Sequence, residues 1–110
     1  MIQDTIGKIE SKLSTSDAIK PEQKSELLQL LGQLKSEIGG LALTNAERAE
    51  TVAGFTEVST HEATRTDRDP ELLDLSVKGL SRAVDQLEES HPQLVGIVNR
   101  LCTVLANSGV

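Results

Sequence analysis

Glu88-Glu89-Ser90-His91-Pro92-Gln93 separates the two most apolar helical runs of the chain, residues 72–87 and 94–105. The order Ser-His-Pro-Gln predicts a helix start in which Ser90 is the N-cap, Pro92 lies in the first turn, and Gln93 completes a capping box with Ser90. Proline disfavours helical geometry in the residue before it, so the preceding helix is expected to end near Glu89. So short a connection predicts that residues 70–110 form a C-terminal helical hairpin.

Both runs flanking this elbow have the apolar period of an amphipathic helix. Asp69-Pro70-Glu71 predicts the start of the first run, with Asp69 as N-cap and Pro70 at the first helical position. Leu72 lies beside the main stripe and is expected to support it. The stripes consist of Leu73, Val77, Leu80, Val84 and Leu87 before the elbow, and of Leu94, Val98, Leu101 and Leu105 after it.

Residues 1–43 predict an N-terminal helical hairpin whose second helix starts at Pro21. Gly39-Gly40 is expected to end or bend that second helix. The two helices carry long apolar stripes, which we interpret as surfaces that a partner covers. The stripes consist of Ile2, Ile6, Ile9 and Leu13, and of Leu27, Leu31, Leu34, Ile38 and Leu41.

Residues 44–66 predict a helix with an unusually small inward face. Thr44 is a candidate N-cap, because Glu47 follows three residues later. Small residues would allow another helix to approach closely, whereas the alternative is a partly mobile segment with too little apolar surface to offset its ordering entropy. The expected inward residues are Ala46, Ala49, Val52, Ala53, Phe55, Val58 and Ala63.

The composition of the chain is that of one small all-α domain, residues 1–110, built as a bundle of four to five helices. Phe55 is the only aromatic residue. Leu, Val, Ile and Ala therefore fill the core, which suits close helix packing better than an aromatic-lined ligand pocket. Because such a core is thin, we expect dimerisation to complete the bundle.

The net charge of −6 argues against nucleic acid as a partner, and weakly against an anionic membrane surface. No run is apolar over the roughly 18 residues that a membrane-spanning helix needs. A single cysteine, Cys102, has no partner for an intrachain disulfide. The chain is therefore expected to be cytoplasmic, and Cys102 is expected to behave as a small apolar core residue with a raised pKa.

The C-terminal half carries a family resemblance in three short stretches. These are the run from Thr60-His61-Glu62-Ala63-Thr64-Arg65 through Asp69-Pro70-Glu71-Leu72-Leu73, the Glu-Ser-His-Pro elbow at residues 89–92, and Leu105-Ala106-Asn107-Ser108-Gly109-Val110. In them the chain resembles the bacterial family known as domain of unknown function 4404, whose members are short helical proteins. The resemblance implies a bacterial origin and a helical fold. It implies no activity and no catalytic or binding residue.

Candidate chemistry rests on few residues, and no catalytic residue and no cofactor is expected. Glu57 and His61 are four residues apart and share a helix face, so with His91 they are weak candidates for a metal site. A purely structural role for these residues is the stronger interpretation, because zinc motifs are absent and His91 is explained as part of a helix start. A local excess of acidic residues in the middle segment is interpreted as a solvated face, with contact to a basic partner as the alternative. These residues are Glu47, Glu50, Glu57, Glu62, Asp67 and Asp69.

We therefore expect a structural or protein interaction module, not an enzyme. Its expected partner is a second copy of the chain, with another protein as the further option. The alternative is a small-ligand or metal-binding regulatory protein that uses His61, His91 and nearby carboxylates.

Overall fold

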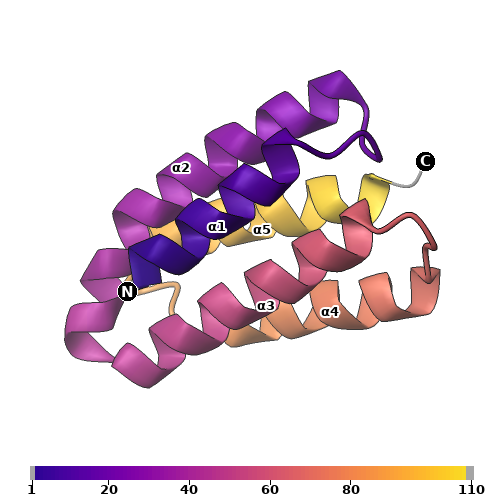
Figure 1. The fold of residues 1–110 in the computed structure, drawn as a ribbon. Coiled ribbons are helices and arrows are strands. Elements are labelled where there is room, and N and C mark those ends of the chain that lie inside the picture. The colour runs from indigo at the N-terminus through magenta and orange to yellow at the C-terminus, as the bar shows by residue number, and fades with distance from the viewer. Residues whose placement is uncertain (1, 109–110) are drawn as a thin grey trace.

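The chain forms an all-helical bundle in the computed structural model, which describes residues 2–108. The molecule is elongated (Figure 1), and its extents are 37 × 24 × 20 Å. The predicted all-α fold is confirmed, and no strand occurs within the described residues. The helices are α1 (Ile2–Ser14), α2 (Pro21–Thr44), α3 (Ala46–Thr64), α4 (Pro70–Ala83) and α5 (Pro92–Asn107).

Successive helices pack against each other along the bundle (Figure 1). α1 packs against α2, α3 against α4, and α4 and α5 form the C-terminal helical hairpin. α5 also returns to α2, which closes the bundle. α3 contacts every other helix, so it is the central element.

The apolar stripes of α1 and α2 are buried inside the single chain. Ile6, Ile9 and Leu13 of α1 are almost completely buried, as is the whole predicted stripe of α2. Our interpretation of these stripes as surfaces that await a partner is therefore wrong. Self-association would have to use a different surface.

Gly39 and Gly40 do not end the second helix, because α2 continues to Thr44. The buried side chains of Ile38 and Leu41 hold the helix on both sides of the glycines, and this packing outweighs the low helix propensity of glycine. A β-carbon at Gly39 would lie 3.1 Å from Nε2 of Gln3, so the glycine also allows α1 to approach. Thr44 is the last residue of α2 and not the predicted cap.

Asn45 caps α3 instead, by accepting a hydrogen bond of 3.0 Å from the backbone nitrogen of Arg48. The predicted helix over 44–66 is present as α3, but part of its inward face was assigned wrongly. Ala49, Val52, Ala53 and Ala63 are buried as expected, whereas Ala46, Phe55 and Val58 are exposed. Small hydroxyl residues take the inward positions, because α3 must fit among all the other helices. These residues are Thr56, Ser59 and Thr60.

Asp69 caps α4 as predicted, by accepting hydrogen bonds from the backbone nitrogens of Glu71 at 3.1 Å and Leu72 at 3.2 Å. α4 ends at Ala83, well before the predicted end near Glu89. The reason lies in the backbone of Gln86, whose φ of 70° turns the chain out of the right-handed helix. A longer connection of turns therefore joins α4 to α5.

The start of α5 also differs from the predicted capping box. Pro92 lies in the first turn as predicted, but it is the first helical residue instead of the second, because His91 is the N-cap; no side chain caps the helix. The hydroxyl of Ser90 lies 3.0 Å from Nδ1 of His91, so Ser90 is not the cap and Gln93 does not complete a capping box. The reason is that the backbone nitrogen of His91 already donates to the carbonyl of Leu87, which fixes the elbow before the helix begins.

Candidate functional site

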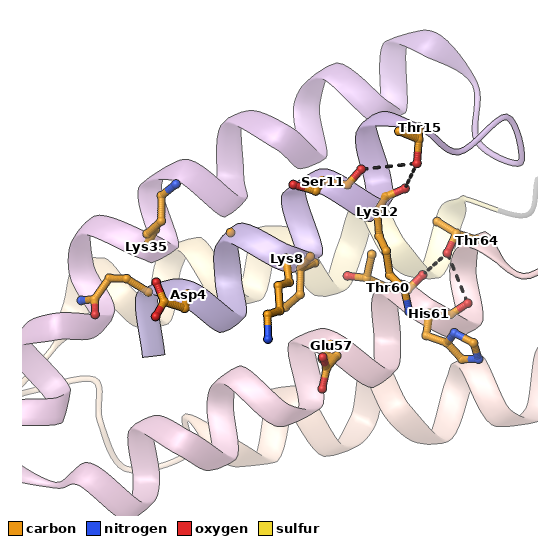
Figure 2. Close-up of a pocket in the computed structure, with 13 residues that line it drawn as sticks. Asp4, Lys8, Ser11, Lys12, Thr15, Lys35, Glu57, Thr60, His61 and Thr64 are labelled. Atoms are coloured by element: carbon orange, nitrogen blue, oxygen red, sulfur yellow. Dashed lines mark hydrogen bonds between the residues drawn. The ribbon is translucent and has the colours of Figure 1, made fainter. Parts of the chain in front are cut away.

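A groove of about 1170 Å³ lies between α1 and α3 (Figure 2). Gly7 contributes to its width, because no atom lies within 4 Å of the place where a β-carbon would stand. Thirteen residues line the groove. They are Gln3, Asp4, Gly7, Lys8, Ile9, Ser11, Lys12 and Thr15 of α1, Lys35 of α2, and Glu57, Thr60, His61 and Thr64 of α3.

Charged groups of both signs face this groove. Lys8 and Lys12 reach from α1 toward α3 in Figure 2, and Glu57 lies on the opposite wall. The ammonium group of Lys35 pairs with Oε1 of Glu10 at 2.6 Å, so its charge is already balanced. The groove could hold a small polar molecule, but the mixture of charges selects neither an anion nor a cation.

The metal candidates are only partly brought together. Glu57 and His61 lie on one face of α3 and both line the groove, as their spacing predicted. His91 is in the connection before α5 and does not line it. Among residues 2–108, no three His, Cys, Asp or Glu side chains gather as a metal site would require. Glu57 and His61 therefore have no third protein ligand in this part of the chain.

Cys102 is half-buried on α5 and lies against α4. Its thiol donates a weak hydrogen bond of 3.7 Å to the carbonyl oxygen of Val77. Burial raises the pKa of the thiol to about 11. Cys102 is therefore protonated at neutral pH and has the apolar environment that the sequence predicted, which does not suit a nucleophile.

The acidic middle segment forms the predicted solvated face only in part. Glu62 is buried, and its Oε1 pairs with Nη1 of Arg65 at 2.9 Å. Arg68 donates to the carbonyl oxygens of Ala63 at 2.6 Å and of Ser108 at 3.2 Å. These contacts tie the α3–α4 connection to the end of α5. Glu47, Glu50, Glu57 and Asp67 remain exposed.

Sequence reasoning missed an exposed apolar surface on the outer side of α3 and α4. Phe55 is 37% exposed and Val58 47%, while Leu72 is 43% and Leu75 64% exposed. The ring of Phe55 lies against Gly79, one helical turn beyond Leu75. The two helices run antiparallel (Figure 1). Val58, three residues after Phe55, and Leu75, four residues before Gly79, therefore both lie one turn from this contact, in the same direction along the bundle. These four side chains, together with Gly79, are named here the α3–α4 face.

A signal for this surface is present in the sequence. Leu72, Leu75 and Gly79 recur at spacings of three and four, which makes a second stripe on α4 beside the buried one. Phe55 and Val58 make the corresponding pair on α3. A helix needs one apolar stripe to enter the core of its own chain, so a second stripe indicates a second contact.

Comparison of the chain with models of protein families, with curated proteins and with solved structures gives no match. Within residues 2–108, none of the helices combines the length and the apolar character needed to cross a membrane.

Proposed function

We propose that this protein is a protein interaction module that docks its partner on the α3–α4 face. The observation that supports this function is the clustering of exposed large apolar side chains. Five such residues occur among the described positions, and Phe55, Val58, Leu72 and Leu75 lie together on two adjacent helices. The fifth, Leu43, is 89% exposed and stands apart near the end of α2.

Clustering matters more than exposure alone. A single exposed leucine such as Leu43 is ordinary on a protein surface, whereas a contiguous apolar patch with a polar rim is typical of a binding surface. The patch is not needed to complete the core of the chain, because most large residues of the main helix stripes are already buried and others, such as Ile2 and Leu73, pack against that core. Phe55 is also the only aromatic side chain, and aromatic residues are enriched at interfaces.

A non-enzymatic role in the cytoplasm of a bacterium accompanies this proposal. The lone protonated thiol of Cys102 fits a reducing compartment. The bacterial origin is supported by the resemblance of the C-terminal half to the family of short helical proteins described above.

The alternative function is that of a small-ligand or metal-binding regulatory protein. The joint placement of Glu57 and His61 on the α1–α3 groove favours it. Titration with Zn²⁺, Mn²⁺, Ni²⁺ and Fe²⁺, followed by thermal shift, tests this alternative. It is supported if one ion stabilises the wild type but not His61→Ala, with His91→Ala as the control outside the groove. Equal responses of the three proteins to every ion would exclude it.

A photo-activated cross-linking residue tests the interaction function directly. It is placed at Leu75 in the α3–α4 face, and in a matched variant at Leu43, and both are expressed in the source cell. We expect discrete cross-linked products of one or a few masses from position 75 and none from position 43. The function is wrong if position 75 gives no product, or if both positions give the same products.

A further inference from the structure

We infer that the partner on the α3–α4 face is a second copy of this chain, related by a two-fold axis that sets the two α4 helices antiparallel. This inference rests on the interaction function proposed above and adds the identity of the partner. Two-fold dimers are the commonest soluble assemblies, and their interface must complement itself. The charges of α4 and the positions of its exposed leucines fit such an interface.

The charges of α4 change sign along the helix. Asp69 and Glu71 lie at its start, whereas Lys78 and Arg82 lie in its second half. An antiparallel second copy brings the acidic start of one helix beside the basic end of the other. A parallel arrangement would place like charges together, which would oppose association.

The positions of the leucines define the register. An axis at Leu75 places the two Leu75 side chains against each other at the centre of the interface. Leu72 then lies one turn from the axis, near Gly79 and the ring of Phe55 in the second copy. The ring of Phe55 covers position 79 within its own copy, so Leu72 of the other copy meets the exposed part of this ring there.

The same register sets Glu71 of each copy beside Lys78 of the other. These residues lie four positions before and three positions after Leu75, and both are exposed. Lys78 already contacts Oδ2 of Asp74 at 2.8 Å, but both side chains of this pair are largely exposed. An exposed ion pair of this kind contributes little to stability, so Lys78 remains available to a second carboxylate.

The size of the face predicts a weak dimer. Four partly exposed apolar side chains form only the centre of an interface, since a stable complex buries roughly 800 Å² on each partner. The charged rim supplies the remaining contacts. We therefore expect dissociation in the micromolar range, with a dimer that weakens as salt screens the rim charges.

Charge exchange between copies tests this register. Lys78→Glu and Glu71→Lys each place like charges together at two symmetric positions, so each variant should dimerise at least roughly tenfold more weakly than the wild type. An equimolar mixture of the two variants restores both attractive pairs, and heterodimers should form with nearly wild-type affinity. Native mass spectrometry and sedimentation velocity measure both effects, and circular dichroism verifies that each variant is folded.

Lys20→Glu and Glu89→Lys are the matched controls, because they reverse exposed charges outside α3 and α4. Each should dimerise as the wild type does. The inference is overturned if the wild type is monomeric up to about 300 µM, a concentration far above the dissociation constant expected here. It is also overturned if the exchange variants associate normally, or if mixing them restores nothing.

These results separate the inference from the function on which it rests. A monomeric protein whose position 75 cross-links to a different protein retains the interaction function and loses the second copy as partner. A monomeric protein without cross-links at position 75 loses both.

Discussion

The ring of Phe55 on α3 lies so close to Gly79 on α4 that a β-carbon at position 79 would overlap the ring. This contact sets the register between the two helices. It also joins their exposed apolar residues into one surface, because Val58 and Leu75 follow one turn further along in the same direction. Glycine is thus required at position 79 because the ring of Phe55 occupies the space of a side chain there, and not because the chain turns.

Gly79→Ala tests this contact through its coupling to Phe55. Alone, the substitution should destabilise the protein by roughly 1–3 kcal/mol, because the added methyl group displaces the ring. In a Phe55→Ala background the same change should instead stabilise by about 0.5–1 kcal/mol through better helix propensity. Urea unfolding of the four proteins measures both steps. Additive effects would show that the ring does not occupy this position.

The caps of α4 and α5 should differ in their contribution to stability. Asp69→Ala should lower the free energy of unfolding by about 1 kcal/mol, because two backbone nitrogens lose their acceptor. Ser90→Ala should change it by less than about 0.5 kcal/mol, because the hydroxyl of Ser90 contacts His91 and caps nothing. Chemical denaturation of both variants compares them. A larger loss of unfolding free energy in Ser90→Ala than in Asp69→Ala would support the capping box that the sequence predicted.

Gln86→Gly should stabilise the connection between α4 and α5. Gln86 has a φ of 70°, which glycine adopts without steric cost, so we expect a gain of roughly 0.5–1 kcal/mol. Gln29→Gly is the matched control in the interior of α2 and should cost about 1 kcal/mol. Thermal unfolding measures both changes. A loss of stability in Gln86→Gly would contradict the left-handed turn.

The raised pKa of Cys102 makes stability fall at high pH. Burial raises the thiol pKa from 9.0 to about 11, so between these values the folded chain retains a proton that the unfolded chain releases. The contribution of the thiol is complete below pH 9 and is lost as pH rises toward 11. Cys102→Ala should lack this component. The difference in unfolding free energy between wild type and variant, measured across this interval, should shrink with increasing pH. A constant difference would mean that the thiol is not desolvated.

The sequence was sufficient to predict the helices and most of the core, because apolar period and proline positions determine them locally. Pro21 and Pro70 each begin a helix as predicted, and Pro92 lies in the first turn of α5 as predicted. The helix ends were harder to predict. The packing of Ile38 and Leu41 carries α2 past Gly39 and Gly40, and a single left-handed residue, Gln86, ends α4 early. The first depends on tertiary packing that no local pattern contains, and the second on a left-handed conformation at a residue that is not glycine.

The candidate surfaces were predicted less well than the fold. The shared helix face of Glu57 and His61 followed from their spacing, but the groove beside them depends on how α1 crosses α3. Phe55 and Val58 were assigned to the core because they are large and apolar. α3 contacts each of the other helices, and their close approach favours small residues on its inner side, so Phe55 and Val58 lie outside.

Sedimentation equilibrium of the purified wild type, Leu75→Glu and Leu43→Glu tests the central claim most directly. All three are measured over about 1–300 µM at low and high salt, which spans the dissociation constants of weak complexes. The wild type and Leu43→Glu should approach the mass of a dimer at the upper end, more readily at low salt, while Leu75→Glu stays monomeric. A wild type that is monomeric throughout, or a Leu75→Glu variant that dimerises equally well, would contradict self-association through the α3–α4 face.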